Sequence, residues 1–208
     1  MSVRILALDT TSEHGSLALL HDGATVAEIA LHGPDGFGHI LFPAVEALLA
    51  RQGWRYADMD GFAAAAGPGS FTGVRIGLAA VKGLAEAAGV RAAAVSTLRA
   101  IASFGTAACR AAVMDARRGE VYGAVFNARL EPLGDEVVCP LERWLASLPT
   151  GAEILTPTPG LLGGRPLTPT PRALAGAVGR LAIGELVDPA ALDANYVRRS
   201  DAELHWRD

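Results

Sequence analysis

The sequence has few residues of the kinds that usually indicate a reactive site. It has only two cysteines, Cys109 and Cys139, and their spacing fits no metal site, so we expect two reduced thiols. Its five histidines are scattered, and no two are spaced to share a helix face, which disfavours a histidine metal site. It also lacks an apolar run near the roughly 20 residues that cross a bilayer. The N-terminus has no secretion-signal pattern, and we expect a cytoplasmic protein with no membrane contact.

Charged residues are scarce as well. They make up 19% of the 208 residues, against 50% hydrophobic residues, and this balance predicts a packed core and excludes a largely disordered chain. The formal net charge of -4 argues against a general nucleic-acid surface, because phosphate binding depends on clustered lysine and arginine. The length allows one large domain or two small lobes.

The hydrophobic pattern predicts an alternation of strands and helices. Asp22-Gly23 is a hairpin signal between two of the strands. The predicted elements are strands over 3–8, 16–20 and 25–31, a helix over 40–50, a strand over 59–66, a glycine-rich turn over 67–73, a helix over 74–88, a strand over 91–96 and a helix over 97–104.

The opening pattern partly recurs in the second half. An apolar strand over 111–114 reaches Asp115, a polar turn follows, and an apolar strand over 121–126 returns, so Asp9 and Asp115 occupy matching positions. The repeat predicts two similar lobes, residues 1–104 and 105–208, and chance similarity of two hairpins is the alternative. The tail is predicted as a helix over 142–147, a strand over 152–155, a loop over 156–171 and a helix over 172–187.

The segment Gly67-Pro68-Gly69-Ser70-Phe71-Thr72-Gly73 is the most distinctive local pattern. A strand, a small-residue turn and a helix start expose backbone N–H groups that can hold an anion. The segment lacks the lysine of a Walker A loop and the third glycine of the dinucleotide fingerprint. The alternative, favoured on the residues alone, is that the glycines permit a sharp turn and a close helix approach.

A polar run, Asp9-Thr10-Thr11-Ser12, ends the first predicted strand. A carboxylate and hydroxyls there can orient a metal-bound water or a phosphate at a sheet edge. The alternative, again favoured, is turn chemistry, in which these side chains bond their own backbone.

Two predicted helices have more apolar or small residues than docking onto one sheet requires. The helix over 40–50 has Leu41, Phe42, Val45, Leu48 and Leu49, and the helix over 74–88 has a small-residue face at Gly77, Ala80, Gly83 and Ala87. Such helices can cover their own sheet on one side and a partner helix on the other. The alternative is that both are ordinary interior helices.

Four separated blocks of the sequence carry a family resemblance. They are ILALDTTSEHGSLALL (5–20), GPGSFTGVRIGLAAVKGLA (67–85), VSTLRAIA (95–102) and MDARRGEVYGAVF (114–126). Together, and in this order, they resemble the TsaB (YeaZ) family, and Tyr196-Val197-Arg198-Arg199 is similar to the closing segment of that family. The resemblance is dense in the N-terminal half and patchy elsewhere, and it implies an α/β fold of the actin/Hsp70/sugar-kinase (ASKHA, ribonuclease H-like) type with two duplicated lobes.

The resemblance implies a non-catalytic role in making threonylcarbamoyladenosine in tRNAs that read ANN codons. It further implies pairing with the catalytic paralogue TsaD, recruitment of the ATPase TsaE, homodimers in isolation, tRNA contact mainly through the complex, and no cofactor. TsaD-like proteins place two histidines at HxxxH spacing on their first helix, whereas here His39 is followed by Pro43, so one ligand is missing. This chain also differs from usual family members at residues 37–40.

The resemblance also assigns candidate residues, none of them catalytic or metal-binding. The partner-binding set is Leu41, Val45, Leu48, Leu49, Ile76, Ala79, Ala80 and Gly83. The vestigial phosphate-binding set is Asp9, Thr10, Thr11, Gly69 and Ser70. Other classes of function remain open: a stand-alone small-molecule kinase of the same superfamily, a glycoprotease-like metallopeptidase, and a scaffold unrelated to tRNA.

Overall fold

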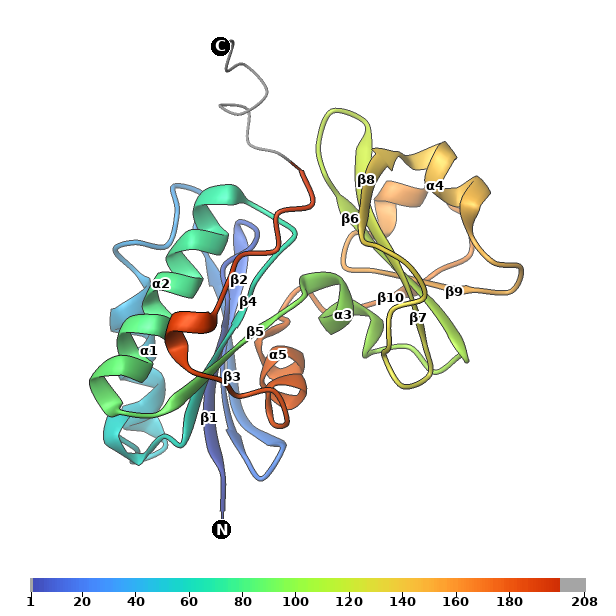
Figure 1. Ribbon diagram of the computed structural model, residues 1–208. Coiled ribbons are helices and arrows are strands. Elements are labelled where there is room, and N and C mark those ends of the chain that lie inside the picture. The colour runs from blue at the N-terminus through green and yellow to red at the C-terminus, as the bar shows by residue number, and fades with distance from the viewer. Residues whose placement is uncertain (1, 199–208) are drawn as a thin grey trace, which may run out of the picture.

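The computed structural model describes residues 2–198, which form two five-stranded sheets with helices on both faces of each (Figure 1). The first sheet has the order β3-β2-β1-β4-β5, and the second has the order β10-β9-β6-β7-β8. Read from its β8 edge, the second sheet repeats the first strand for strand. The predicted duplication is therefore confirmed, and the α/β fold is that of the actin/Hsp70/sugar-kinase proteins.

The first sheet begins as an antiparallel meander. Its strands are β1 (Arg4–Asp9), β2 (His14–His21), β3 (Ala24–His32), β4 (Gly61–Ala65) and β5 (Arg91–Val95). Asp22 and Gly23 both have positive φ, 50° and 81°, which is the turn that matches the twist of a two-residue hairpin. β4 and β5 then run parallel to β1. The predicted hairpin is thus observed at the predicted residues.

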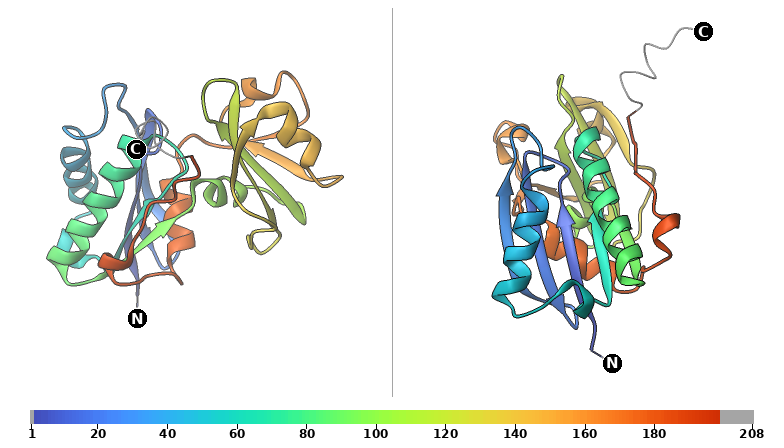
Figure 2. Two further views of the ribbon diagram at one scale, coloured as in Figure 1. Left: turned by 45° about the horizontal axis from the view of Figure 1, so that its top comes forward. Right: turned by 90° about the vertical axis from the view of Figure 1, so that its left-hand side faces the viewer.

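Three helices cover the first sheet because β1 and β2 send apolar side chains to both of its faces. α1 (Leu41–Arg51) and α2 (Phe71–Ala88) lie on one face, over leucines such as Leu6 and Leu17 (Figure 2). α5 (Ala175–Ala182) lies on the other, over Ile5 and Leu20. Full burial of one such side chain contributes about 1.5–3 kcal/mol.

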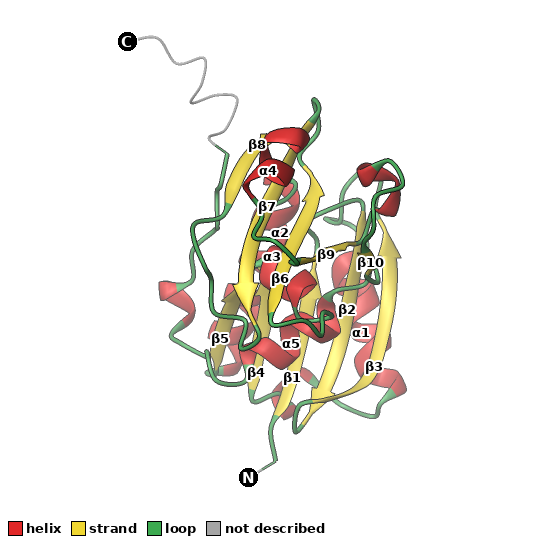
Figure 3. Ribbon diagram, turned by 90° about the vertical axis from the view of Figure 1, so that its right-hand side faces the viewer, coloured by secondary structure: helices red, strands yellow, loops and turns green. Residues whose placement is uncertain are grey.

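The second sheet is also covered on both faces (Figure 3). Its strands are β6 (Cys109–Asp115), β7 (Glu120–Asn127), β8 (Val137–Pro140), β9 (Glu153–Thr156) and β10 (Thr168–Pro169). α3 (Thr97–Ala102) packs with Ala112 and Ala124 on one face. α4 (Leu141–Ser147) places the buried Trp144 against the other face, where a Cβ on Gly123 would lie 2.1 Å from the indole nitrogen.

The lobes exchange helices, which differs from the predicted division at residues 104 and 105. α3 follows the last strand of the first sheet but packs on β6 and β7, and α5 follows the last strand of the second sheet but packs on β1 and β2. The strands do fall on either side of the predicted boundary. The covering helices do not, because each crosses to the opposite sheet.

Short 3-10 turns connect several of these elements, at Tyr56–Asp58, Pro159–Leu162 and Pro189–Ala191. Over residues 2–198, no helix is both long enough and apolar enough to span a membrane.

Candidate functional site

The turn after β1 and the loop before α2 lie against each other. The polar run over 9–12 and the glycine-rich segment over 67–73 can therefore form one site. The Ser70 N–H donates to the Thr11 carbonyl at 2.6 Å, and the Thr10 hydroxyl donates to the Gly73 carbonyl at 2.7 Å. The five candidate phosphate-binding residues, Asp9, Thr10, Thr11, Gly69 and Ser70, therefore come together in space. The two segments lie 58 or more positions apart in the sequence, and they meet here because β1 and β4 are neighbouring parallel strands.

The glycines of this loop allow the two segments to approach closely. A Cβ on Gly73 would lie 1.9 Å from the Thr10 carbonyl oxygen, and a Cβ on Gly69 would lie 2.4 Å from that of Thr11. Real Cβ atoms do not approach a backbone oxygen so closely, so only glycine fits at these positions. The start of α2 thus lies close to the turn after β1, as expected if the glycines serve helix packing, which was the alternative to an anion site.

Part of the donor capacity at the α2 N-terminus is used within the chain. The Ser70 side chain is the N-cap and accepts from the Gly73 N–H at 3.2 Å, while the Ser70 N–H is bonded to Thr11. Satisfied donors are less available to a phosphate group. Anion binding at this loop remains a prediction.

Asp9 is the most deeply buried carboxyl group of this region, at 1% exposure. One of its oxygens accepts both the Thr11 N–H at 2.8 Å and the Thr11 hydroxyl at 2.7 Å. Burial raises the pKa of Asp9, and the two hydrogen bonds from Thr11 offset part of that rise. Asp115, its counterpart in the second lobe, is exposed and accepts the Arg117 N–H at 2.7 Å. Both carboxylates therefore show the predicted turn chemistry.

Most of the predicted partner-binding residues lie in the core of the chain itself. Leu41, Val45, Leu48 and Leu49 are at most 3% exposed and pack against the first sheet, and Ala80 is 7% exposed. Side chains that fill the core offer little surface to a partner, so this burial argues against their assignment to a partner surface, which stays a prediction. Of the remaining three residues, Ile76 is partly buried, while Ala79 and Gly83 are exposed. Most of the apolar residues of α1 lie on one wide buried face of the helix.

The solvent-facing side of α1 and α2 combines small residues with a few large ones, and we call it the two-helix face. No heavy atom lies within 4 Å of the position that a Cβ would take on Gly83. Phe42, 45% exposed, and Phe71, 39% exposed, are its large apolar members. The face comprises Phe42, Pro43, Glu46, Ala47 and Ala50 of α1, with Phe71, Arg75, Ala79, Gly83, Glu86 and Ala87 of α2.

The geometry around His39 agrees with the sequence pattern. His39 is exposed and precedes α1, and the position one turn later is Pro43, which cannot bind a metal. Within residues 2–198, no three His, Cys, Asp or Glu side chains gather as a group that could hold a metal ion.

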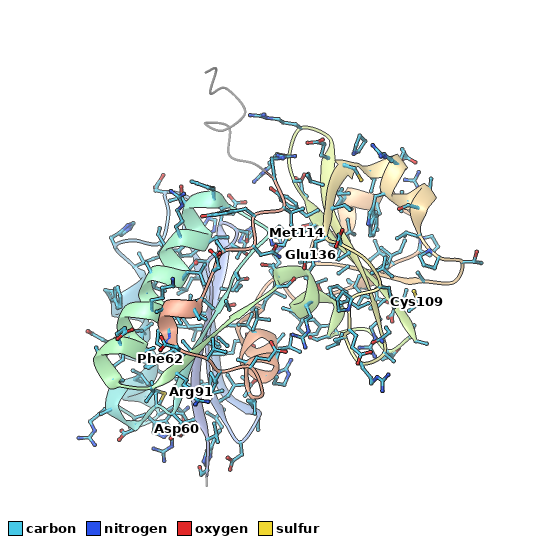
Figure 4. The ribbon with its side chains drawn as sticks, in the orientation of Figure 1. Asp60, Phe62, Arg91, Cys109, Met114 and Glu136 are labelled. Atoms are coloured by element: carbon cyan, nitrogen blue, oxygen red, sulfur yellow. The ribbon has the colours of Figure 1, made fainter. Side chains whose placement is uncertain are left out.

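Sequence reasoning missed a polar junction between the lobes that is centred on Glu136 (Figure 4). This carboxylate, in the loop before β8, accepts hydrogen bonds from the Ser96 hydroxyl and from the Asn195 side chain. Burial raises the pKa of Glu136, and the two hydrogen bonds lower it by less. Family-like blocks in the sequence contain Ser96 and begin at Tyr196, but neither of them indicates a role for Glu136.

Comparison with known proteins places these features in a family. The model of the family "TsaD: tRNA N6-adenosine threonylcarbamoyltransferase" matches residues 36–161. A solved structure described as YeaZ from Pseudomonas aeruginosa superposes with a TM-score of 0.78 and 30% identity, over 93% of this chain and 99% of that one. The chain belongs to the TsaB/YeaZ family. A second Pseudomonas aeruginosa structure, described as similar to peptidase YEAZ, matches over 94% of this chain and 100% of that one, at 31% identity and a TM-score of 0.78.

Curated members of the family are similar over shorter segments. The tRNA threonylcarbamoyladenosine biosynthesis protein TsaB of Escherichia coli K12 is 41% identical over 60% of this chain and 55% of its own length. The TsaB of Bacillus subtilis 168 is 34% identical over 69% of this chain and 65% of its own length. The chain thus spans less than two thirds of these relatives. The fold alone extends further, to an ethanolamine utilization protein EutJ at 13% identity and a TM-score of 0.56.

Proposed function

We propose that this chain is a non-catalytic subunit in the biosynthesis of threonylcarbamoyladenosine in tRNAs that read ANN codons. The observation that carries the proposal is family membership combined with Pro43 at the position where the second histidine of an HxxxH pair would stand. Without that imidazole, the chain lacks one ligand of the metal site expected in a TsaD-like enzyme. Its contribution is then structural, and it needs no cofactor.

The proposed partner is a TsaD-like paralogue, which binds the two-helix face. Small exposed residues such as Ala79 and Gly83 let a partner helix cross closely, and the exposed ring of Phe42 can fill a pocket on the partner. The same face, paired with a second copy, accounts for a homodimer when the chain is alone. The partner residues are thus proposed to be Ile76, Ala79 and Gly83 from the original set, with Phe42 in place of the buried leucines.

A TsaE-like ATPase is proposed to join the pair, and tRNA is proposed to bind mainly through the complex. The net charge of -4 supports indirect tRNA contact, because this chain offers no overall positive field. The loop over 67–70 is retained from a nucleotide-binding ancestor in this proposal. Its glycines now serve the close packing of α2.

Reconstitution tests the proposed function. Purified TsaD-like and TsaE-like proteins from the same genome are mixed with a threonylcarbamoyl-adenylate source and tRNA, with or without this chain. Modified nucleoside is measured by mass spectrometry of digested tRNA. We expect product only when the chain is present, and none from the chain alone. Product at full rate without it, or turnover by the chain alone, would contradict the proposal.

Three further measurements separate the alternatives. Tight stoichiometric binding of ATP and magnesium by the lone chain, measured by calorimetry, would favour a small-molecule kinase. Metal-dependent cleavage of a glycoprotein substrate would favour a metallopeptidase. Copurification from native extract with a TsaD-like protein at equal stoichiometry supports the proposed pairing, and a different main partner would contradict it.

A further inference from the structure

Residues 192–198 run across both lobes, and we call this segment the strap. Its beginning belongs to the first lobe, where Leu192 is 5% exposed and packs with Ala194 into the core beneath α1 and α2. Its end belongs to the second lobe, where Val197 packs against the core on the α3 side of that sheet. In Figure 1 it is the red chain that leads from the last 3-10 turn to the junction of the lobes.

Asn195 joins three separate segments at the middle of the strap. Its backbone N–H donates to the Ala66 carbonyl at 2.8 Å. Its side-chain amide donates to one Glu136 oxygen at 2.7 Å and to the Gly67 carbonyl at 3.4 Å. The second Glu136 oxygen accepts from the Ser96 hydroxyl. The Glu136 carboxylate of the second lobe therefore holds the end of β5 and the strap directly, and Asn195 extends the connection to the loop before α2.

Two side chains that follow Asn195 fasten the strap to the two lobes. Tyr196 accepts a hydrogen bond from the Arg75 Nε at 2.9 Å, and its ring centroid lies 5.1 Å from that of Phe71 at the start of α2. Arg198 donates to the Ala116 carbonyl at 2.8 Å and forms an ion pair with Glu120 in the second lobe.

We propose that the strap acts as a latch between the lobes and that Glu136 is the residue that holds it closed. The strap fixes the angle between the two sheets and holds the loop over 67–70 in place. The geometry supports this assignment because the polar bonds join segments that are far apart in the chain and belong to different lobes. Breaking them frees the lobes to open while each sheet keeps its own ladder of hydrogen bonds. The latch acts within the chain, and Tyr196 connects it to Phe71 and Arg75 at the edge of the two-helix face.

Hydrogen exchange of the full chain, read by mass spectrometry, tests the latch. In Glu136→Ala we expect amides in residues 66–73 and 193–198 to exchange about tenfold to a hundredfold faster, as loss of hydrogen bonds to a charged group predicts. Peptides from β1 and β6 should keep their wild-type rates, and small-angle scattering should give a larger radius of gyration. Glu136→Gln keeps an acceptor oxygen and should have an intermediate effect.

Asn195→Ala should reproduce the Glu136→Ala pattern, and the double variant should add little, because both changes remove the same bond. Glu131→Ala is the matched control, because Glu131 is an exposed glutamate of the same loop whose side chain bonds Asn127 at the end of β7 and Arg129, and it should leave residues 66–73 unchanged. Unchanged exchange at 66–73 in the Glu136 and Asn195 variants would overturn the latch. Equal acceleration of β1 and β6 would also overturn it, since the bonds would then support only global stability.

Discussion

Single residues at the turn after β1 couple the stability of the fold to pH. The raised pKa of Asp9 means that the folded protein binds this proton more tightly than the unfolded chain does. The contribution of Asp9 to the stability of the fold is most favourable at pH values below its ordinary pKa of 3.8. This contribution is lost as the pH rises through the raised pKa of the folded state. Asp9→Asn keeps an acceptor for the Thr11 N–H and hydroxyl but does not titrate.

We therefore expect the stability of the wild type relative to Asp9→Asn to fall as pH rises through this window, and then to level off. Urea unfolding of both proteins at a series of pH values measures the difference. A difference that stays constant from pH 3.5 to pH 8, or that grows in favour of the wild type, would show that burial does not dominate the environment of Asp9.

The glycines of α2 differ in what a methyl group would meet, and this gives a matched pair of substitutions. Gly73→Ala places a Cβ 1.9 Å from the Thr10 carbonyl oxygen, and we expect a loss of about 3 kcal/mol as the helix is pushed away. Gly83→Ala enters open space in the same helix and should gain about 0.5–1 kcal/mol. Thermal unfolding of both variants measures the contrast, and similar values for both would refute the close approach.

Within α2, adjacent alanines have opposite roles. Ala80 is buried, so an arginine there would disrupt the core of the monomer and would not report on an interface. Ala79 is exposed on the two-helix face, and Ala79→Arg should leave the fold intact while weakening binding to the TsaD-like partner about tenfold or more.

Binding is measured by calorimetry, with circular dichroism to check the fold. Ala146→Arg is the matched control, because Ala146 is an exposed alanine of α4 that lies outside the two-helix face. If Ala79→Arg binds as well as Ala146→Arg, the partner does not use this face.

The elements of the fold were largely predictable, and the burial of individual side chains was not. The strands β1 and β2 have long aliphatic runs, and the α2 pattern ends at Gly89, which caps the helix with φ 66°. The short strands β8, with four residues, and β10, with two, were missed. The helix predicted over 172–187 spans only 175–182, and its remainder forms a bridge from Val187 to Ala92.

The candidate site was predictable only in part, for a related reason. The residues Asp9 to Thr11 and Gly69 to Ser70 do meet, because polar residues that follow neighbouring parallel strands share one edge of a sheet. Which face of α1 is buried could not be read from its composition, since its apolar residues exceed a single narrow stripe. The Glu136 junction depends on how two lobes sit together, and no local pattern encodes that arrangement.

For the whole molecule, the exchange of α3 and α5 makes each half of the chain depend on the other. Residues 1–104 made alone would leave the face of the first sheet with Ile5 and Leu20 bare, and residues 105–208 would leave the face with Ala112 and Ala124 bare. We expect each fragment alone to be aggregated or molten, and the two together to form a stable complex. Size-exclusion chromatography and near-ultraviolet circular dichroism test this, and a well-folded, monomeric fragment would contradict it.

The same exchange sets an order of events during synthesis. The ribosome releases β1 to β5 long before it releases α5, so one apolar face of the first sheet stays uncovered while the whole second sheet is being translated. Native tertiary structure in the first lobe therefore forms only after α5 has been made, however early its strands pair. Until the last quarter of the chain has emerged, that bare face is a natural substrate for a holding chaperone.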